Sequence, residues 1–108
     1  YSEGLAKKHL AKGEVVFLDL KASWCSTCAA QERVIKSLKA ANPDYDKKIT
    51  FIDVDWDDHG NGSLVGELNI PRRSTLVVLK GDKELGRIVA GTGKSEIKAL
   101  MDVALAAS

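Results

Sequence analysis

The sequence predicts one α/β domain in which helices cover both faces of a central, mixed four-stranded sheet. The chain has 108 residues, which is the size of a single domain. Apolar runs rich in β-branched residues alternate with segments whose apolar residues recur at helical spacing. Strand–helix–strand units favour parallel strands, and a hairpin near the end adds antiparallel strands to the same sheet. We therefore expect the order α-β-α-β-α-β-β-α over residues 1–108.

The first half of the chain is predicted to alternate two helices with two strands. In chain order these elements are a helix at 5–10, a strand at 14–22, a helix at 25–41 and a strand at 48–56. The helices are predicted because their apolar residues recur every three or four positions, and Gly13 and the segment NPD act as their stop signals. The strands are predicted from near-continuous apolar runs, which are typical of strands covered on both faces.

The second half is predicted to contain a short helix, a β-hairpin and a final helix. These elements lie at 63–68, 74–91 and 94–107, and the segment DDHGNGS at 57–63 is expected to be a loop. The hairpin is predicted because two apolar β runs flank the turn pair Gly81-Asp82. The final helix places five apolar residues on one face.

The charge balance gives no reason to propose a nucleic-acid or membrane partner. Sixteen basic residues stand against fifteen acidic ones, so the net charge is +1. No apolar run approaches the roughly 18 residues of a membrane span, so we expect no membrane insertion. The acidic segment at 53–59 does not match a calcium-binding EF-hand, because Asp58 and Leu64 stand where that pattern needs Gly and Glu. We expect a solvated loop there.

The two cysteines, Cys25 and Cys28, lie in the segment SWCSTCAA, where a predicted strand gives way to a predicted helix. The first turn of a helix has free N–H groups and a partial positive charge, which lower the pKa of a cysteine there. The second sulfur follows nearly one helical turn later and so lies close to the first. Such a pair can exchange with a disulfide: one accessible thiolate attacks, and the shielded second thiol resolves the mixed disulfide.

Stability, metal binding and inert packing are the other roles open to this pair. A bridge between Cys25 and Cys28 closes a very short loop, so it adds little stability. A zinc site needs four ligands, and only His9 and His59, from distant segments, are available as histidine ligands. Two buried, unreactive thiols are the remaining alternative.

Three segments, FLDLKASWCSTC, STLVVLKGDKE and GRIVAG, resemble the thioredoxin family. The specific feature is Trp-Cys-x-x-Cys after a buried strand, with the matching order of elements downstream. The resemblance covers nearly the whole chain and implies a thioredoxin fold and thiol–disulfide oxidoreductase activity. It implies that Cys25 is the nucleophile and Cys28 the resolving thiol. It also implies that no cofactor is needed beyond their redox-active disulfide.

Asp19 and Trp24 are further candidate site residues. Asp19 interrupts a buried strand, where an ionised carboxylate is costly, so we expect its pKa to rise toward neutrality. The family has a buried acid six residues before its first cysteine, which implies that Asp19 accepts the proton of Cys28, through water; the alternative is a strand-end carboxylate facing solvent. Many relatives have a lysine beside this acid, and Phe51 stands there instead. Trp24 offers substrates a flat apolar contact, or else simply packs on the sheet edge.

The main departure from the family lies in the segment NIPRRSTLVV. Family members have a cis-proline immediately before the Thr-Leu pair, and Ser74 stands at that position, before Thr75. The Arg73–Ser74 peptide bond is therefore either trans or a strained cis bond. We expect the Ser74 hydroxyl to face the cysteines and to open the site, which would alter substrate release and ease adventitious metal capture.

We expect substrate contacts around this departure. The backbone of Arg73, next to Ser74 and Thr75, is expected to pair with an extended substrate as an added strand. Arg72 and Arg73 place positive charge beside the site, where they either steer an acidic partner or are simply solvated. Gly91 is expected at the rim of the site, where backbone comes close, and an ordinary turn glycine is the alternative.

The predicted function is exchange with protein disulfides, foremost as a reductant. The alternatives are an oxidase or isomerase with the same residues, and a metal-binding or chaperone-like module on the same scaffold. We expect an upstream reductase or membrane electron donor to recharge the cysteines, and the protein to be a monomer. The chain begins at Tyr1 and departs from the family at Phe51 and Ser74. We therefore expect a specialised bacterial protein of the periplasm or another extracytoplasmic compartment, with the cytoplasm as the alternative.

Overall fold

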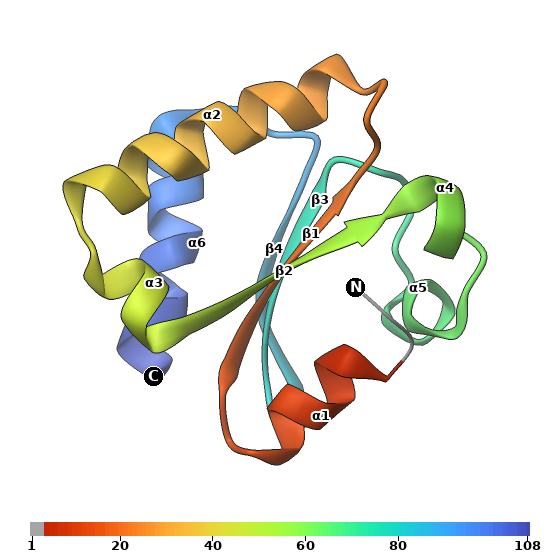
Figure 1. The fold of residues 1–108 in the computed structure, drawn as a ribbon, viewed down its shortest axis with the longest axis horizontal. Helices are drawn as coiled ribbons and strands as arrows, with labels where there is room; N and C mark the ends of the chain where they lie inside the picture. The colour runs from red at the N-terminus through yellow and green to blue at the C-terminus, as the bar shows by residue number, and fades with distance from the viewer. Residues whose placement is uncertain (1–3) are drawn as a thin grey trace.

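The computed structural model describes residues 4–108, in which the predicted mixed sheet lies between two layers of helices (Figure 1). The first three residues of the predicted 1–108 domain lie outside the described residues. The strands are β1 (Val15–Lys21), β2 (Ile49–Asp55), β3 (Thr75–Lys80) and β4 (Lys83–Val89). The helices are α1 (Leu5–Ala11), α2 (Ser26–Ala41), α3 (Asp44–Lys48), α4 (Trp56–His59), α5 (Ser63–Leu68) and α6 (Lys94–Ala107).

The strand order β2-β1-β3-β4 confirms the predicted mixture of parallel and antiparallel pairs. β1 and β2 are parallel and are joined through α2 and α3, whereas β3 is antiparallel to both β1 and β4. β1 therefore has a neighbour on each side, and every one of its residues except Lys21 is buried. This central position explains the near-continuous apolar run from which the strand was predicted.

Two short helices were not predicted. α3 begins at Asp44, the last residue of the NPD segment. Pro43 precedes the helix with a φ of −61°, and the Asn42 side chain accepts a hydrogen bond from the N–H of Asp44. α4 occupies the start of the segment 57–63, so the prediction of a loop there was wrong for its first part. The Asp55 carboxylate caps α4 by accepting from the N–H of Asp57 at 2.9 Å. Helices of four or five residues show no periodic pattern, so local capping is their only sequence signal.

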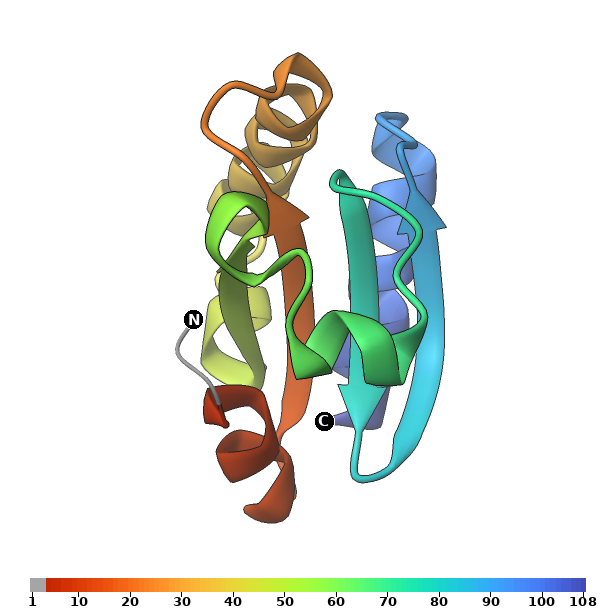
Figure 2. The same ribbon diagram turned by 90° about the vertical axis from the view of Figure 1, so that its right-hand side faces the viewer.

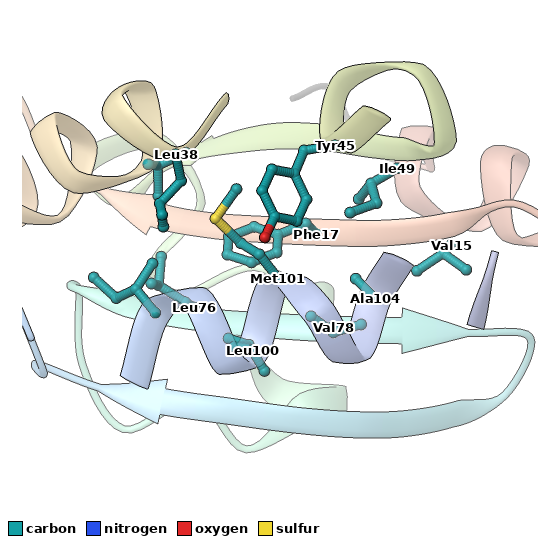
Figure 3. Close-up of a cluster of buried hydrophobic side chains, with 12 residues drawn as sticks. Val15, Phe17, Leu38, Tyr45, Ile49, Leu76, Val78, Leu100, Met101 and Ala104 are labelled. Carbon is teal, nitrogen blue, oxygen red and sulfur yellow. The ribbon is translucent and has the colours of Figure 1, made fainter. Parts of the chain in front are cut away.

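Each face of the sheet buries its own apolar cluster, because alternate residues of a strand point to opposite faces. On one face α2, α3 and α6 pack over β1 and β3, and Figure 3 shows this cluster, with Phe17 from β1 and Leu100 and Met101 from α6. On the other face, toward the viewer in Figure 2, α1 and α5 pack over Leu18 and Leu20. No helix within residues 4–108 is both long enough and apolar enough to cross a membrane.

Candidate active site

Cys25 and Cys28 lie at the junction between β1 and α2, as predicted. Cys25 is the N-cap of α2, and its Sγ accepts a hydrogen bond from the N–H of Cys28 at 3.1 Å. The two residues form a disulfide, with Cα atoms 5.2 Å apart. Both side chains are buried, at 4% and 2% exposed, and they cluster with Ala22 and the partly buried Trp56. The accessible sulfur that we expected at Cys25 is therefore not seen in this disulfide form.

The Ser74 hydroxyl lies against both sulfurs. Its Oγ is 3.1 Å from Sγ of Cys25 and 3.0 Å from Sγ of Cys28, and the residue is fully buried. The Arg73–Ser74 peptide bond is trans, as are all peptide bonds among residues 4–108. Ser74 has a φ of 63°, in the left-handed region that non-glycine residues seldom adopt. The hydroxyl thus faces the cysteines as predicted, but Cys25, Cys28 and Ser74 are all buried, so the predicted opening of the site is not seen.

The backbone around Ser74 explains why a proline would not fit in this conformation. Proline holds φ near −65°, whereas the φ of Ser74 is positive. The N–H of Ser74 donates to the carbonyl of Leu20 at 2.7 Å, and proline has no N–H. The carbonyl of Ser74 in turn accepts from the N–H of Ala90 at 2.8 Å. The departure from the family pattern therefore changes the backbone of this loop as well as the side chain.

Gln31 is a buried residue of the site that was not predicted. Its Nε2 donates to the carbonyl oxygens of Ser74 and Gly91, both at 2.9 Å. Gln31 lies on α2 one turn after Cys28, so it ties this helix to the loop before β3 and the loop after β4. The sequence signal is a polar side chain on the apolar stripe that also contains Cys28, Ile35 and Leu38.

Gly91 lies at a point of close packing and not in an open turn. A Cβ at this position would approach Cγ2 of Ile88 to 2.8 Å and would also meet the side chain of Glu96. Because its carbonyl is held by Gln31, Gly91 belongs to the same network as Ser74. Gly91 is thus closely packed against two side chains, whereas its place at the rim of the site and a contact with substrate stay predictions.

Trp24 and Arg73 form a stacked pair on the surface beside the cysteines. Trp24 is 58% exposed, and the Cζ atom of Arg73 lies 4.3 Å from the centre of the tryptophan ring system. The indole N–H donates to the Asp57 carboxylate at 3.0 Å. The Arg73 carbonyl, expected to pair with substrate, accepts from Nε of Arg72 at 3.0 Å. Thr75 is buried, and its hydroxyl donates to the carbonyl of Arg72 at 2.7 Å, so it braces this loop.

Asp19 is buried on the face of β1 that packs against α2, so it does not face solvent. Its Oδ1 atom is buried and has no hydrogen-bond partner within the described part of the chain. Burial, reinforced by the negative charge of Asp53 on β2, raises the pKa of Asp19 to about 7. A hollow of about 170 Å³ adjoins this carboxyl and is lined by Phe17, Asp19, Glu32, Ile35, Lys36, Lys39, Phe51 and Asp53.

Phe51 stands where a lysine was looked for beside this acid, and the positive charges that act on Asp19 come from Lys21 and, more weakly, from Lys39. Phe51 pairs in register with Phe17, and their rings lie 5.0 Å apart. The Nζ atom of Lys39, from α2, lies 3.8 Å from the centre of the Phe51 ring and 3.1 Å from the Asp46 carboxylate. Its positive charge acts to lower the pKa of Asp19, against the larger effect of burial. Lys39 was not predicted as a site residue.

Within residues 4–108, no three side chains of His, Cys, Asp or Glu gather as ligands for a metal ion. The acidic segment after β2 has structural contacts instead: Asp55 caps α4, and Asp57 accepts from Trp24. His9 lies 3.1 Å from the Glu14 carboxylate.

Comparison with known proteins places the chain among thioredoxins. A family model described as Thioredoxin matches residues 3–103. The chain is 30% identical over 90 residues to Thioredoxin H2-1 of Oryza sativa subsp. japonica, covering 83% of this chain and 60% of that protein. It is 33% identical over 81 residues to Thioredoxin O1, mitochondrial, of Arabidopsis thaliana, covering 75% of this chain and 39% of that protein. The chain thus spans less than two thirds of the length of either plant relative.

Similarity extends to a bacterial relative and to solved structures. The chain is 28% identical over 93 residues to Thioredoxin of Chlorobaculum thiosulfatiphilum, which covers 86% of this chain and 82% of that protein. It superposes on the crystal structure of Trxlp from Edwardsiella tarda EIB202 with a TM-score of 0.78 and 25% identity, over 93% of this chain and 94% of that one. The family model, the relatives and the fold agree with the Cys-x-x-Cys site, and the chain belongs to the thioredoxin family.

Proposed function

We propose that the protein is a thiol–disulfide oxidoreductase that exchanges its Cys25–Cys28 couple with disulfides of other proteins, as a reductant. The observation that carries this proposal is the disulfide at the N-terminus of α2, where Sγ of Cys25 accepts the N–H of Cys28. After reduction, the same N–H and the partial positive charge of the helix end stabilise a thiolate at Cys25. Membership of the thioredoxin family supports the same chemistry.

The reaction that we propose has two steps, both of which conserve electrons. The Cys25 thiolate attacks one sulfur of the substrate disulfide, whose S–S bond breaks, and the released substrate thiolate takes a proton from solvent. Cys28 then loses its proton and attacks Sγ of Cys25, which forms the Cys25–Cys28 disulfide and releases the second substrate thiolate, and this thiolate takes a proton from solvent. Two electrons have then passed to the substrate. Asp19 is our candidate for the acceptor of the Cys28 proton, since a pKa of about 7 suits transfer near neutral pH.

Trp24 and Arg73 are our candidates for direct substrate contact. The exposed indole, with the guanidinium of Arg73 stacked on it, offers a flat surface beside the cysteines. The Arg73 carbonyl becomes available to an added strand of substrate once the Arg72 side chain releases it. Ser74, Thr75 and Gly91 bind other groups of the protein here, and we propose that they shape the two loops that receive the substrate.

Repeated turnover as a reductant consumes electrons, so we propose an upstream reductase or a membrane electron donor as a second partner. The extracytoplasmic location and the monomeric state stay predictions from the sequence. Cell fractionation and analytical ultracentrifugation check them.

Reduction of insulin disulfides by the pre-reduced protein tests the proposed function. A Cys28→Ser variant should trap substrates as mixed disulfides at Cys25, and a Cys25→Ser variant should not. Equilibration with glutathione then decides whether the protein reduces or oxidises its substrates: a reduction potential of about −270 mV for the Cys25–Cys28 couple marks a reductant, and one of about −120 mV marks an oxidant. Absence of exchange in the wild-type protein refutes the proposal.

A further inference from the structure

The Ser74 hydroxyl lies within hydrogen-bond distance of both reacting sulfurs, at 3.1 and 3.0 Å. Because the sulfurs of a disulfide carry no hydrogen, the hydroxyl is the donor in this form. A disulfide sulfur is a weak acceptor, whereas hydrogen bonds to a charged acceptor are about twice as strong as neutral ones. A hydroxyl fixed at this place therefore stabilises the reduced, thiolate form more than the disulfide.

The position of this hydroxyl is set by the backbone and does not depend on the sulfurs. The N–H of Ser74 is held by Leu20, and its carbonyl accepts from both Gln31 and Ala90. Its φ of 63° is a conformation that a non-glycine residue keeps only when its surroundings impose it. Ser74 is also fully buried, so water does not compete with the sulfurs for its hydroxyl.

We propose that Ser74 is a catalytic residue whose hydroxyl donates a hydrogen bond to whichever cysteine sulfur carries the negative charge. This inference rests on the thiol–disulfide exchange proposed above. In the reduced protein with Cys25 ionised, Ser74 donates to the Cys25 thiolate and accepts from the S–H of Cys28. Once Cys25 is in the mixed disulfide and Cys28 has lost its proton, rotation of the hydroxyl turns the donor to Sγ of Cys28. Ser74 keeps its own proton throughout, and the electrons balance as in the exchange itself.

Ser74→Ala removes the donor and keeps the same demand for a positive φ. The reduced form then loses stability relative to the disulfide, so the equilibrium with glutathione shifts about tenfold toward the disulfide, or about 30 mV to a more negative potential. The pKa of the Cys25 thiol, read from thiolate absorbance against pH, rises by about one. Ser74→Gly also lacks the hydroxyl but adopts a positive φ without strain, so it should give the same two changes.

Ser23→Ala is the matched control, because Ser23 is an exposed serine two residues before Cys25. Its equilibrium and pH profile should stay within about twofold of wild type. If Ser74→Ala does not fold, Ser74→Gly decides, since glycine adopts the positive φ without strain and keeps the N–H that donates to Leu20. Wild-type values in both Ser74 variants overturn this inference and leave the proposed function standing. Failure of the wild-type protein to exchange with glutathione overturns both.

Discussion

Replacing Asp19 with asparagine is expected to stabilise the oxidised protein at pH 8 and to change its stability little at pH 4. Burial against α2, with Asp53 beside it, raises the pKa of Asp19 from 3.8 to about 7. At a pH below the lower of these two pKa values, Asp19 is protonated in both the folded and the unfolded chain. Between the two values the unfolded chain releases a proton that the folded protein retains, so stability falls as the pH rises. At a pH above the higher pKa, Asp19 is ionised in both states and the free energy of unfolding falls no further.

The size of this effect follows from the two pKa values. They differ by about three, and each pKa unit corresponds to about 1.4 kcal/mol, so ionisation of Asp19 costs the folded protein about 4 kcal/mol at pH 8. Asparagine has nearly the same shape and no charge. The gain in free energy of unfolding should therefore be about 4 kcal/mol larger at pH 8 than at pH 4. Comparing one variant at two pH values cancels the packing and hydrogen-bonding changes that the amide introduces.

Urea unfolding followed by circular dichroism measures this difference, with the disulfide kept intact so that no thiol titrates. Asp82→Asn is the control, because Asp82 is an exposed carboxylate in the turn between β3 and β4. Its effect should stay within about 0.5 kcal/mol at both pH values. Equal stabilisation by Asp19→Asn at pH 4 and pH 8 would refute the reasoning. Asp19 would then ionise in the folded protein as it does in the unfolded chain, and its proposed role as a proton acceptor would lose its basis.

Three further substitutions test other parts of the site. Gln31→Leu should lower the free energy of unfolding by about 1–3 kcal/mol, because the carbonyls of Ser74 and Gly91 lose their donor and the only compensating gain is loss of the unpartnered Oε1. Arg33→Leu, at an exposed position of the same helix, should have little effect, and an equal loss in both variants would contradict a role of Gln31 in holding the two loops. Lys39→Met should raise the pKa of Asp19 slightly, as measured by NMR titration of its carboxyl group, because one of the two lysines that lower this pKa is removed and Lys21 remains. An unchanged titration would show that Lys39 does not act on Asp19. Trp24→Ala should raise KM for a protein disulfide several-fold and leave exchange with glutathione unchanged. An equal loss of activity toward the protein disulfide and toward glutathione would argue against Trp24 as part of a surface that binds protein substrates.

The elements that were predictable from the sequence are those with long, regular patterns. β1 was predictable because a strand with neighbours on both sides and helices on both faces needs a continuous apolar run. α2 was predictable because its buried stripe repeats over 16 residues. α3 and α4 were not, because their formation depends on single local interactions at Asn42 and Asp55 that a periodic pattern cannot reveal.

The candidate site divides in the same way between local and distant contacts. The two cysteines were predictable because three residues of spacing at the start of a helix determine how close their sulfurs lie. Gln31 was not, because its partners lie 43 and 60 residues away along the chain. Ser74 was singled out by its departure from the family pattern, but its positive φ and trans peptide bond depend on partners in β1, α2 and the loop after β4.

A serine, unlike a proline, does not fix its own φ, so the loop before β3 depends on polar contacts to hold its conformation. Leu20, Ala90 and Gln31 together bind the N–H and the carbonyl of Ser74, and these contacts position the hydroxyl on the two sulfurs. Gln31 contacts this backbone while its own position is set by α2, the helix that also begins at the cysteines. Loss of Gln31 should therefore loosen the hydroxyl without removing it. The redox equilibrium of Gln31→Leu should accordingly shift in the same direction as that of Ser74→Ala, by a smaller factor.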